Sequence, residues 1–430
     1  MPALMSVTVP LFLPVFMALA APAGGGLDPF DEAGLAAAVW EGTPDVVAAR
    51  VALIDAETAR ERSLLLPNPG LTATWGTIPI GERNPKDLPF SQVPNYDLSV
   101  GQFVELGKRA PRQAAARAGR EEARLALLDV YRNRFLDLLQ TLGDQAAATA
   151  RAAVLRRLIE GSDHTLRLER DRVAKEDLAQ MDVDRLQVEH FRLVSSLSDA
   201  EAAQEGAAGA CARILARECP RFADEDTARR FLARMSPPAP EGDEAALAAR
   251  PDVQGFAATE TRARAELTLA ERQKIPDPTV MAGFTHDEFV ASGNQGNSLM
   301  LSLSLPLPLF DRGQPEIARS NARVALASIG RQSVTSAGRS GAVASRRQLA
   351  YLVERARRLD EQAIPLARSV AERMEHGFSS AGGIKLQDVL LARRASEELQ
   401  LDRIDVAATT HAVLLDLRRA TGQSPPAPGP

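Results

Sequence analysis

Residues 299–323, LMLSLSLPLPLFDRGQPEIARSNAR, join a strand pattern to a helix pattern and decide the fold. Leucine occupies every second position from 299 to 305, which is the period of a strand with one apolar face. Pro306 and Pro308 cannot donate to a strand ladder, because proline has no backbone N–H. A polar turn, Asp-Arg-Gly at 311–313, then precedes a segment rich in alanine and charged residues. We therefore expect a strand that leads directly into a helix.

An earlier stretch follows the same plan. Residues 98–118, LSVGQFVELGKRAPRQAAARA, again place a short strand before a basic glycine turn and a helix. The triplet Pro67-Asn68-Pro69 is likewise repeated as Pro276-Asp277-Pro278, and matched positions are about 204 to 209 residues apart. This pattern predicts an internal duplication. The expected parts are a first structural repeat at 24–236, a second at 237–422 and a disordered tail at 423–430.

Each repeat is predicted to contain a helix, two strands and a very long helical hairpin, so the fold class is mainly α with a small β part. Proline is absent between Pro111 and Pro220, which allows two long helices in the first repeat. In the second repeat, Pro365 is expected to kink the outgoing helix. The predicted strands are 71–77, 96–104, 279–284 and 299–305, and the other predicted helices are 31–41, 43–66, 315–375 and 384–421.

The longest helices must pack against one another. A helix of roughly 60 residues extends about 90 Å, far more than a globular domain needs. Such helices are stable when they bury their apolar stripes as coiled coils. In the first hairpin the predicted stripe consists of Leu125, Leu128, Phe135, Leu139 and Leu142.

Composition limits the class of protein. The 430 residues are 45% hydrophobic but only 4% aromatic, which favours long packed helices over sandwiches of many strands. The net charge is −5, and acidic and basic residues are interleaved, so we expect no nucleic-acid partner.

Residues 1–23 are predicted to be a secretory signal peptide, because an apolar core at 7–19 is followed by small residues. The alternative is a disordered apolar N-terminus, since no Lys or Arg lies near the start and Pro10 and Pro14 interrupt the core. No other window reaches the roughly 18 apolar residues that a spanning helix needs. Any membrane crossing by the mature chain must therefore use strands.

Cys211 and Cys219 are the only cysteines. On a continuous helix their Cα atoms would be about 12 Å apart, beyond the reach of a disulfide. A bridge therefore requires the helix to break between them, and Pro220 makes such a break plausible. Two unpaired buried thiols are the alternative.

The four predicted strands cannot close a barrel by themselves, yet residues 299–305 are too apolar on one face for an open sheet in water. Association of several chains would remove the exposed edges, and three chains with four strands each give a 12-stranded outer-membrane β-barrel. Aromatic residues within or at the ends of the strands suit the interfaces of a membrane. They are Trp75, Tyr96, Phe103, Phe284 and Phe289.

With these features the chain resembles the TolC-type outer-membrane efflux proteins, the exit ducts of tripartite pumps and type I secretion systems. The resemblance covers residues 31–422 and rests on the two proline triplets, on Glu105-Leu106-Gly107-Lys108-Arg109 and on PLPLFDRG at 306–313. It implies a homotrimer with a β-barrel among the lipids of the outer membrane and a coiled-coil tunnel in the periplasm. It also implies two partners, a periplasmic adaptor and an inner-membrane RND-type pump. The turn at 105–109 looks most like the heavy-metal efflux branch of the cobalt-zinc-cadmium and copper-silver type.

The chain departs from the family pattern at three points. It has no lipid-modifiable cysteine after the predicted signal peptide, Met374 replaces a tyrosine, and Leu391 stands where some members carry a second aspartate. Asp388 matches the first aspartate of that pattern. We therefore predict that three copies of Asp388 surround the periplasmic gate. The alternative is a solvated carboxylate that the helix dipole stabilises.

The turns of the two hairpins are predicted to dock the adaptor, because their glycines and small residues suit close packing of another hairpin. These residues are Ala174, Lys175, Glu176, Asp177, Gly377, Phe378, Gly382 and Gly383.

No catalytic motif is present in the sequence. It lacks a phosphate-binding glycine loop, a nucleophile elbow, a metal quartet and paired carboxylates, and its five histidines show no pair at ligand spacing. We expect no enzyme activity, no cofactor and no bound metal. The predicted function is passive export of substrate, namely metal cations, across the outer membrane. Drug efflux, type I protein secretion and a periplasmic coiled-coil adaptor are the alternatives.

Overall fold

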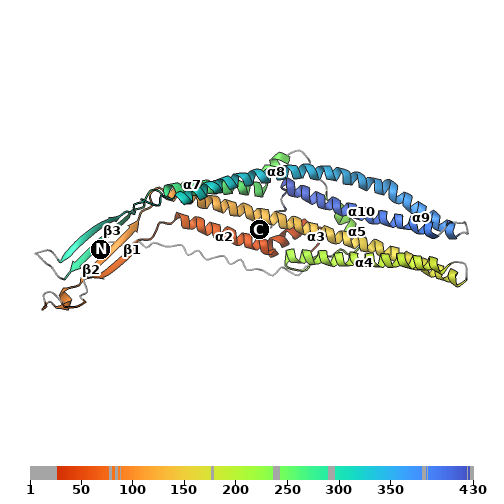
Figure 1. Ribbon diagram of the computed structural model, residues 1–430, viewed down its shortest axis with the longest axis horizontal. Helices are drawn as coiled ribbons and strands as arrows, with labels where there is room; N and C mark the ends of the chain where they lie inside the picture. Colours follow the sequence, from red (N-terminus) through yellow and green to blue (C-terminus); the bar gives the residue numbers. More distant parts are fainter. Residues whose placement is uncertain are drawn as a thin grey trace.

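The computed structural model describes residues 27–76, 80–82, 86–87, 89–175, 179–235, 243–288, 296–379, 384, 386–423 and 425–426. The predicted signal peptide lies outside these residues, as does most of the predicted tail. The chain is elongated, with a small sheet at one end and the turns of two helical hairpins at the other (Figure 1). The predicted fold class, mainly helical with a four-stranded β part, is confirmed.

The sheet is antiparallel, and its strand order follows the chain. The strands are β1 (Gly70–Gly76), β2 (Asn95–Phe103), β3 (Thr279–Asp287) and β4 (Asn297–Ser304). All four predicted strands are confirmed, with ends that shift by at most three residues. The second strand of the first half thus pairs with the first strand of the second half, through partners such as Leu98 and Phe284. β1 and β4 are left as the two edges.

In the first half, two short helices precede β1 and two long helices follow β2. They are α1 (Glu32–Gly42), α2 (Pro44–Leu64), α3 (Arg109–Ala174) and α4 (Gln180–Leu215). α3 packs along both α2 and α4. In the predicted stripe on α3, Leu128 is half-buried and the other four residues are buried. The stripe therefore marks the core, as the spacing predicts.

The second half repeats this order with α7 (Pro251–Arg272), α8 (Gln314–Arg358), α9 (Ile364–Ser379) and α10 (Leu386–Thr421). A π-helical turn, Leu359–Ala363, separates α8 from α9. It lies directly before Pro365, which has no N–H to donate to the carbonyl of Glu361. The hydrogen bonding of the outgoing helix therefore changes from α-helical to π-helical just before Pro365, the position at which a kink is predicted.

Two short helices between the halves were not predicted, α5 (Glu225–Ala233) and α6 (Asp243–Ala248). Asp224 begins α5, because its carboxylate accepts a hydrogen bond from the N–H of Thr227 at 2.7 Å. The ring of Phe231 on α5 is fully buried and packs edge-on against Phe222, with 5.1 Å between ring centroids. α5 contacts both α3 and α10, so it joins the two halves near the middle of the molecule.

Cys211 and Cys219 form a disulfide, with a Cα–Cα distance of 5.7 Å. The helix break that this bond requires is present, since α4 ends at Leu215 and Ala216 adopts a left-handed conformation with φ of 52°. The alternative of two unpaired thiols is wrong. The sequence gives little sign of this helix end, because alanine rarely adopts a left-handed conformation.

The end of α10 is held by two arginines, Arg132 on α3 and Arg250, the residue that precedes α7. Arg132 donates to the carbonyl of Arg419 at 3.2 Å, and Arg250 donates to that of Ala420 at 3.0 Å. Asp252 binds Arg250 at 2.5 Å and lies 3.8 Å from Arg132. Burial tends to raise the pKa of Asp252, but the hydrogen bond and charge of Arg250 bring it below its usual value. The buried cations satisfy carbonyls that the helix leaves without partners.

Candidate functional site

The two faces of the sheet differ in chemistry. The strand register places alternate residues of all four strands on one apolar face. On the edge strand β4, Leu299, Leu301 and Leu303 are 87%, 84% and 68% exposed. The face consists of Leu71, Ala73, Trp75, Tyr96, Leu98, Val100, Val280, Ala282, Phe284, Leu299, Leu301 and Leu303. Such a continuous exposed apolar surface is typical of a surface that another molecule or a membrane covers.

The opposite face carries mostly small and polar residues, although Phe103, Met281 and Met300 also belong to it. Ser302 lies across from Met281, and Ser99 lies across from Gly283. Ser99 is only 2% exposed, and the hydroxyl of Thr285 donates to Asp97 at 3.1 Å. The sheet therefore separates an apolar side from a hydrogen-bonding side, as the alternation at 299–305 predicts.

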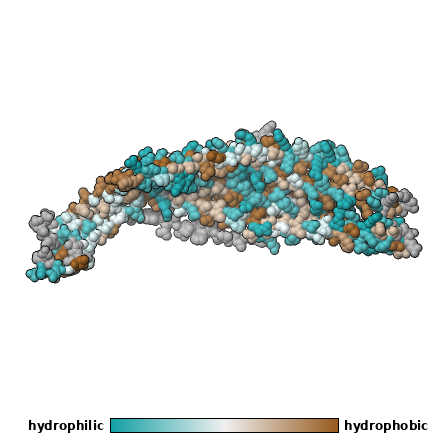
Figure 2. Space-filling view, viewed as in Figure 1, coloured by the Kyte–Doolittle hydropathy of each residue, from teal (hydrophilic) through white to brown (hydrophobic). Residues whose placement is uncertain are grey.

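Exposed apolar side chains continue past the sheet towards the helices. Leu307, Leu309 and Phe310 are 67%, 64% and 94% exposed. Figure 2 shows hydrophobic side chains gathered over the segment between the sheet and the helices, whereas the helical part has a mixed surface. Among the described residues, no helix combines the length and the apolar character that a bilayer span requires.

The junction between β2 and α3 is closed by a residue from the second half. Asp277, in the triplet before β3, accepts a hydrogen bond from the N–H of Leu106 at 2.9 Å. Its carboxylate also forms an ion pair with Lys108 at 2.6 Å. The side chains of Lys108 and Asp277 are 13% and 10% exposed. Gly107, between Leu106 and Lys108, has φ of 72°, a conformation that glycine adopts without strain. The second proline triplet and the basic glycine turn after β2 therefore meet in one buried contact. The sequence alone did not predict this contact.

At the other end of the molecule, the two helical hairpins contact each other near their turns. Leu186 on α4 is buried in a cluster against which Phe378 on α9 and Leu390 on α10 pack. The guanidinium of Arg172 lies over the ring of Phe378, 4.9 Å from its centroid. This places the predicted docking residue Phe378 beside the last turn of α3, close to Ala174 and Lys175.

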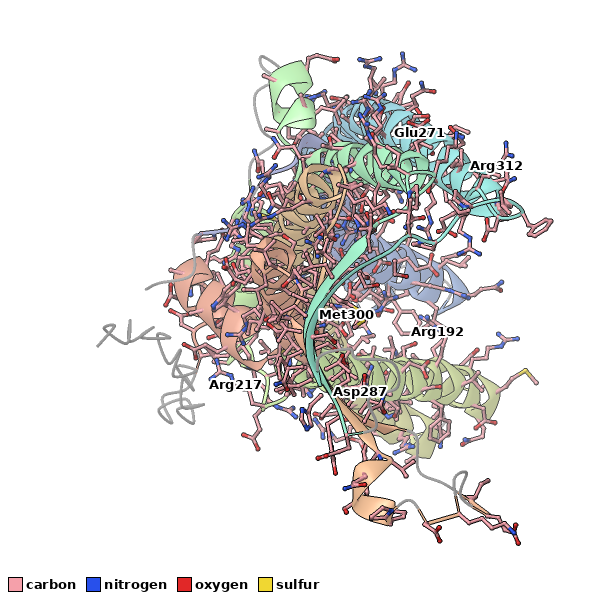
Figure 3. The ribbon with its side chains drawn as sticks, turned by 90° about the vertical axis from the view of Figure 1, so that its left-hand side faces the viewer. Arg192, Arg217, Glu271, Asp287, Met300 and Arg312 are labelled. Atoms are coloured by element: carbon pink, nitrogen blue, oxygen red, sulfur yellow. A yellow bond between two sulfur atoms is a disulfide. The ribbon has the colours of Figure 1, made fainter. Side chains whose placement is uncertain are left out.

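Charged side chains also join the hairpins. Arg192 on α4 lies 3.4 Å from Glu397 on α10, and Arg394 lies 3.9 Å from Glu189. In the view along the molecule, Arg192 lies at the side of the helical part, where α4 and α10 run near each other (Figure 3). Burial raises the pKa of Glu397, against the charges of the arginines nearby. The contact is therefore a partly buried charge network.

Asp388 lies in the first turn of α10 and is exposed. A hollow of about 480 Å³ between α4 and α10 is lined by its neighbour Gln387 and by the apolar side chains of Met181, Val188 and Leu391. Leu391 is 59% exposed. Charged side chains line the same hollow, so Asp388 lies beside a surface of mixed chemistry, with Asp184, Arg185, Glu189 and Arg394 in the lining.

The predicted docking residues that the structure describes lie at the ends of α3 and α9. Ala174 ends α3 and Lys175 caps it, while Gly377 and Phe378 lie in the last turn of α9. Gly377 leaves room for the end of the Ile384 side chain, which a Cβ atom at this position would displace. Four of the predicted residues lie outside the described part of the chain, namely Glu176, Asp177, Gly382 and Gly383.

Nothing in the described part of the chain suggests a metal centre. No three His, Cys, Asp or Glu side chains come together there in a way that could hold an ion. His411 is fully buried, and its Nε2–H donates a hydrogen bond to the carbonyl of Leu139 at 3.1 Å. Burial lowers the pKa of His411 to about 4. It is therefore neutral near pH 7 and belongs to the core.

Known structures share this fold, although sequence comparison detects no relative. No protein-family model and no curated protein sequence matches the chain. CusC, whose structures concern transmembrane channel formation, is 12% identical with a TM-score of 0.75 over 94% of this chain and 96% of its own. The outer membrane protein VceC of Vibrio cholerae is 16% identical with a TM-score of 0.73, over 90% and 95%. The outer membrane channel CmeC of Campylobacter jejuni is 12% identical with a TM-score of 0.74, over 94% and 90%.

Proposed function

We propose that this chain is the subunit of an outer-membrane exit duct, of the TolC type, in a tripartite efflux system. The observation that carries the proposal is the two-faced sheet with two unpaired edges, joined to helical hairpins far longer than a globular domain needs. Three chains would close a barrel of twelve strands with the apolar face towards lipid and the polar face towards the lumen. The helices would continue this barrel as a tunnel in the periplasm. The shared fold with outer membrane channels supports the same assignment.

Two partners follow from this role. The tips of the hairpins would dock a periplasmic adaptor, which in turn would connect the duct to an inner-membrane RND-type pump. The close approach at Gly377 and the apolar ring of Phe378 offer a compact surface for another helical hairpin. A duct of this kind needs no catalytic group, since the pump supplies the energy.

We assign metal cations as the cargo, on the resemblance of the turn at 105–109 to the heavy-metal branch. A strain that lacks the gene is expected to become hypersensitive to cobalt, zinc, cadmium, copper or silver salts, with unchanged tolerance of dyes and antibiotics. Growth across such a panel, with a plasmid-borne copy as the control, measures this. A broad drug phenotype would overturn the metal assignment and favour drug efflux, and loss of a secreted protein would favour type I secretion. A soluble periplasmic monomer in fractionation would overturn the duct itself.

Asp388 is our candidate for the periplasmic gate. Three copies around an axis would concentrate negative charge and hold multivalent cations. Asp388→Ala is therefore expected to raise single-channel conductance, or to weaken block by a trivalent cation by about tenfold, equivalent to about 1.4 kcal/mol of binding. Asp182→Ala is the matched control, because Asp182 also lies in the first turn of a helix at the hairpin tip. If both variants conduct and are blocked like the wild type, Asp388 is only a helix-start carboxylate.

A further inference from the structure

All four connections between strands and helices lie at the same end of the sheet (Figure 1). The strand register places Phe103, Thr279 and Ser304 side by side at this end. With the adjoining ends of the helices, the connections are residues 60–66, 104–113, 271–278 and 305–319, which we call the junction collar. The collar lies where the apolar face of the sheet ends, so it is next to whatever covers that face.

Each segment of the junction collar exposes large apolar side chains. They come from the connections of both edge strands and of both central strands. They include Leu65, Leu66, Leu106, Ile275, Leu307 and Phe310. The collar therefore extends the exposed apolar surface from the sheet to the ends of the helices, which is typical of a surface that another molecule or a membrane covers.

The junction collar also carries an excess of basic residues. Its four segments contain nine Lys or Arg and six Asp or Glu, although the whole chain has a net charge of −5. At the opposite end of the sheet, residues 76–95 and 287–297 contain two basic and four acidic residues. The net charge therefore changes sign along the sheet, from positive at the collar to negative at the other end.

Several cations of the collar have no carboxylate partner within the described residues. Arg62, Arg272, Lys274 and Arg312 are exposed, and no Asp or Glu that the structure describes lies within ion-pair distance of them. They come from three of the four segments. Each of these side chains therefore keeps its charge available for an anion from outside the chain.

The turn before α8 shows how one of these cations is kept available. The N–H of Arg312 donates to Gln314 at 2.9 Å, and the N–H of Gly313 donates to the carboxylate of Asp311 at 2.8 Å. The adjacent carboxylate is thus bonded to the backbone of the turn and not to the guanidinium. Arg312 lies at the periphery of the molecule, two residues from the exposed ring of Phe310 (Figure 3).

Contacts between the segments hold the collar in a fixed arrangement. Arg109 at the start of α3 donates to the carbonyl of Leu64 at 3.0 Å, so the end of α2 is joined to the start of α3. Asp277 and Lys108 join the segment before β3 to the segment after β2 through their buried ion pair. The exposed apolar and basic groups are therefore displayed by a backbone that these contacts fix in place.

We propose that the junction collar binds the phosphate groups of anionic phospholipids in the membrane leaflet next to the helices. Its apolar side chains enter the acyl region, and its arginines and lysine reach the headgroups, as long basic side chains do at a membrane surface. A guanidinium suits this contact because it can donate two parallel hydrogen bonds to phosphate oxygens. The proposal rests on the proposed function in requiring the apolar face to meet lipid, and it adds the lipid class and the residues.

Charge favours anionic lipid over a second copy of the chain as the partner of this surface. Arg62 lies beside β1 and Arg312 lies beside β4, at the two edges of the sheet. Two copies that met through their collars at these edges would bring unpartnered cations together, which is unfavourable. An anionic headgroup instead neutralises them, and each Lys or Arg near an anionic lipid surface strengthens the association about fivefold.

Quenching of tryptophan fluorescence by lipid tests the proposal in the reconstituted full-length protein. The chain has two tryptophans, so Trp40→Phe with Trp75→Phe and Phe310→Trp leaves a single indole, in the collar. The vesicles contain phosphatidylglycerol and phosphatidylcholine, and one lipid at a time carries brominated acyl chains. We expect phosphatidylglycerol to associate with this indole about fivefold more strongly than phosphatidylcholine. Equal association of the two lipids would overturn the proposal.

Removal of charge separates the collar from a general attraction to anionic lipid. Arg272→Gln with Arg312→Gln is expected to bring the ratio of the two association constants down to about one. Arg347→Gln with Arg368→Gln is the matched control, because these exposed arginines on α8 and α9 also have no carboxylate partner in the described part of the chain. We expect this control to keep the ratio of the unsubstituted collar. If both double variants keep the ratio, or both lose it, the collar is not the site.

A second reporter separates failure of the collar from failure of the duct. In Trp40→Phe alone, Trp75 marks the opposite end of the apolar face, where we expect quenching by both lipids without a preference for phosphatidylglycerol. Quenching of Trp75 without a preference at the collar would overturn the collar site and leave the duct standing. If neither indole is quenched, the apolar face does not meet lipid and both proposals are wrong.

Soluble phosphate is the other source of the same chemical group. Replacing chloride by inorganic phosphate at equal ionic strength keeps the screening of charge constant. We expect the preference for phosphatidylglycerol at the collar to remain. Its loss in phosphate alone would identify a site for the soluble anion and overturn the assignment to lipid.

Discussion

Asp277→Ala is expected to lower the free energy of unfolding by about 3 kcal/mol, because it leaves the nearly buried ammonium of Lys108 without a counter-charge. The backbone N–H of Leu106 loses its acceptor in the same step. Thermal or denaturant unfolding of the purified protein in detergent, followed by circular dichroism, measures the change. The junction carries the strand end onto α3, so its loss affects both the sheet and the hairpin.

Two controls separate this effect from ordinary loss of a salt bridge. Glu57→Ala removes the partner of Arg120 at 3.0 Å, but these side chains are 45% and 40% exposed, so we expect a loss below about 1 kcal/mol. Adding Lys108→Met to Asp277→Ala removes the unpaired charge and should recover part of the stability. If the free energy of unfolding of Asp277→Ala lies within about 1 kcal/mol of the wild-type value, the contact of Asp277 with Lys108 and Leu106 does not stabilise the junction as a buried ion pair.

Leu301→Arg is expected to destabilise the chain in a lipid bilayer by about 2–4 kcal/mol, because it places a charge midway along β4 on the apolar face. Leu301 is 84% exposed and lies across from Ala282, so the substitution removes little internal packing. Unfolding of the protein in lipid vesicles by guanidinium, followed by tryptophan fluorescence, gives the measurement.

Ser302→Arg is the matched control for this substitution. Ser302 is the next residue along β4 and belongs to the polar face. An arginine there would point into the proposed lumen, and we expect a loss of stability below about 1 kcal/mol. Equal losses from both variants would mean that the apolar face does not meet lipid.

The sequence predicts the elements well where one local signal decides them. The alternation at 299–305 gives β4 and the identity of its two faces, and the stripe from Leu125 to Leu142 gives the buried side of α3. The proline triplets give the starts of β1 and β3. In each case the spacing of apolar residues or the missing proline N–H fixes the local geometry.

Contacts between distant segments could not be predicted in this way. The sequence shows Asp277 as part of a repeated motif, but not that its carboxylate binds a junction 169 residues earlier. The disulfide depended on a helix break at Ala216, where alanine gives no signal for a left-handed conformation. α5 was missed although Asp224, Glu225 and Asp226 form a capped acidic first turn. The tip contact of Arg172 with Phe378 likewise requires the packing of two hairpins.

In the proposed function, several copies of this chain form a duct across a membrane. Single-channel recording tests it most directly, with the purified full-length protein added to a planar lipid bilayer. We predict stepwise ion currents of uniform size, which Leu301→Arg reduces in frequency because fewer assemblies insert. Folded, helical protein that produces no current steps and remains monomeric in detergent would contradict the claim.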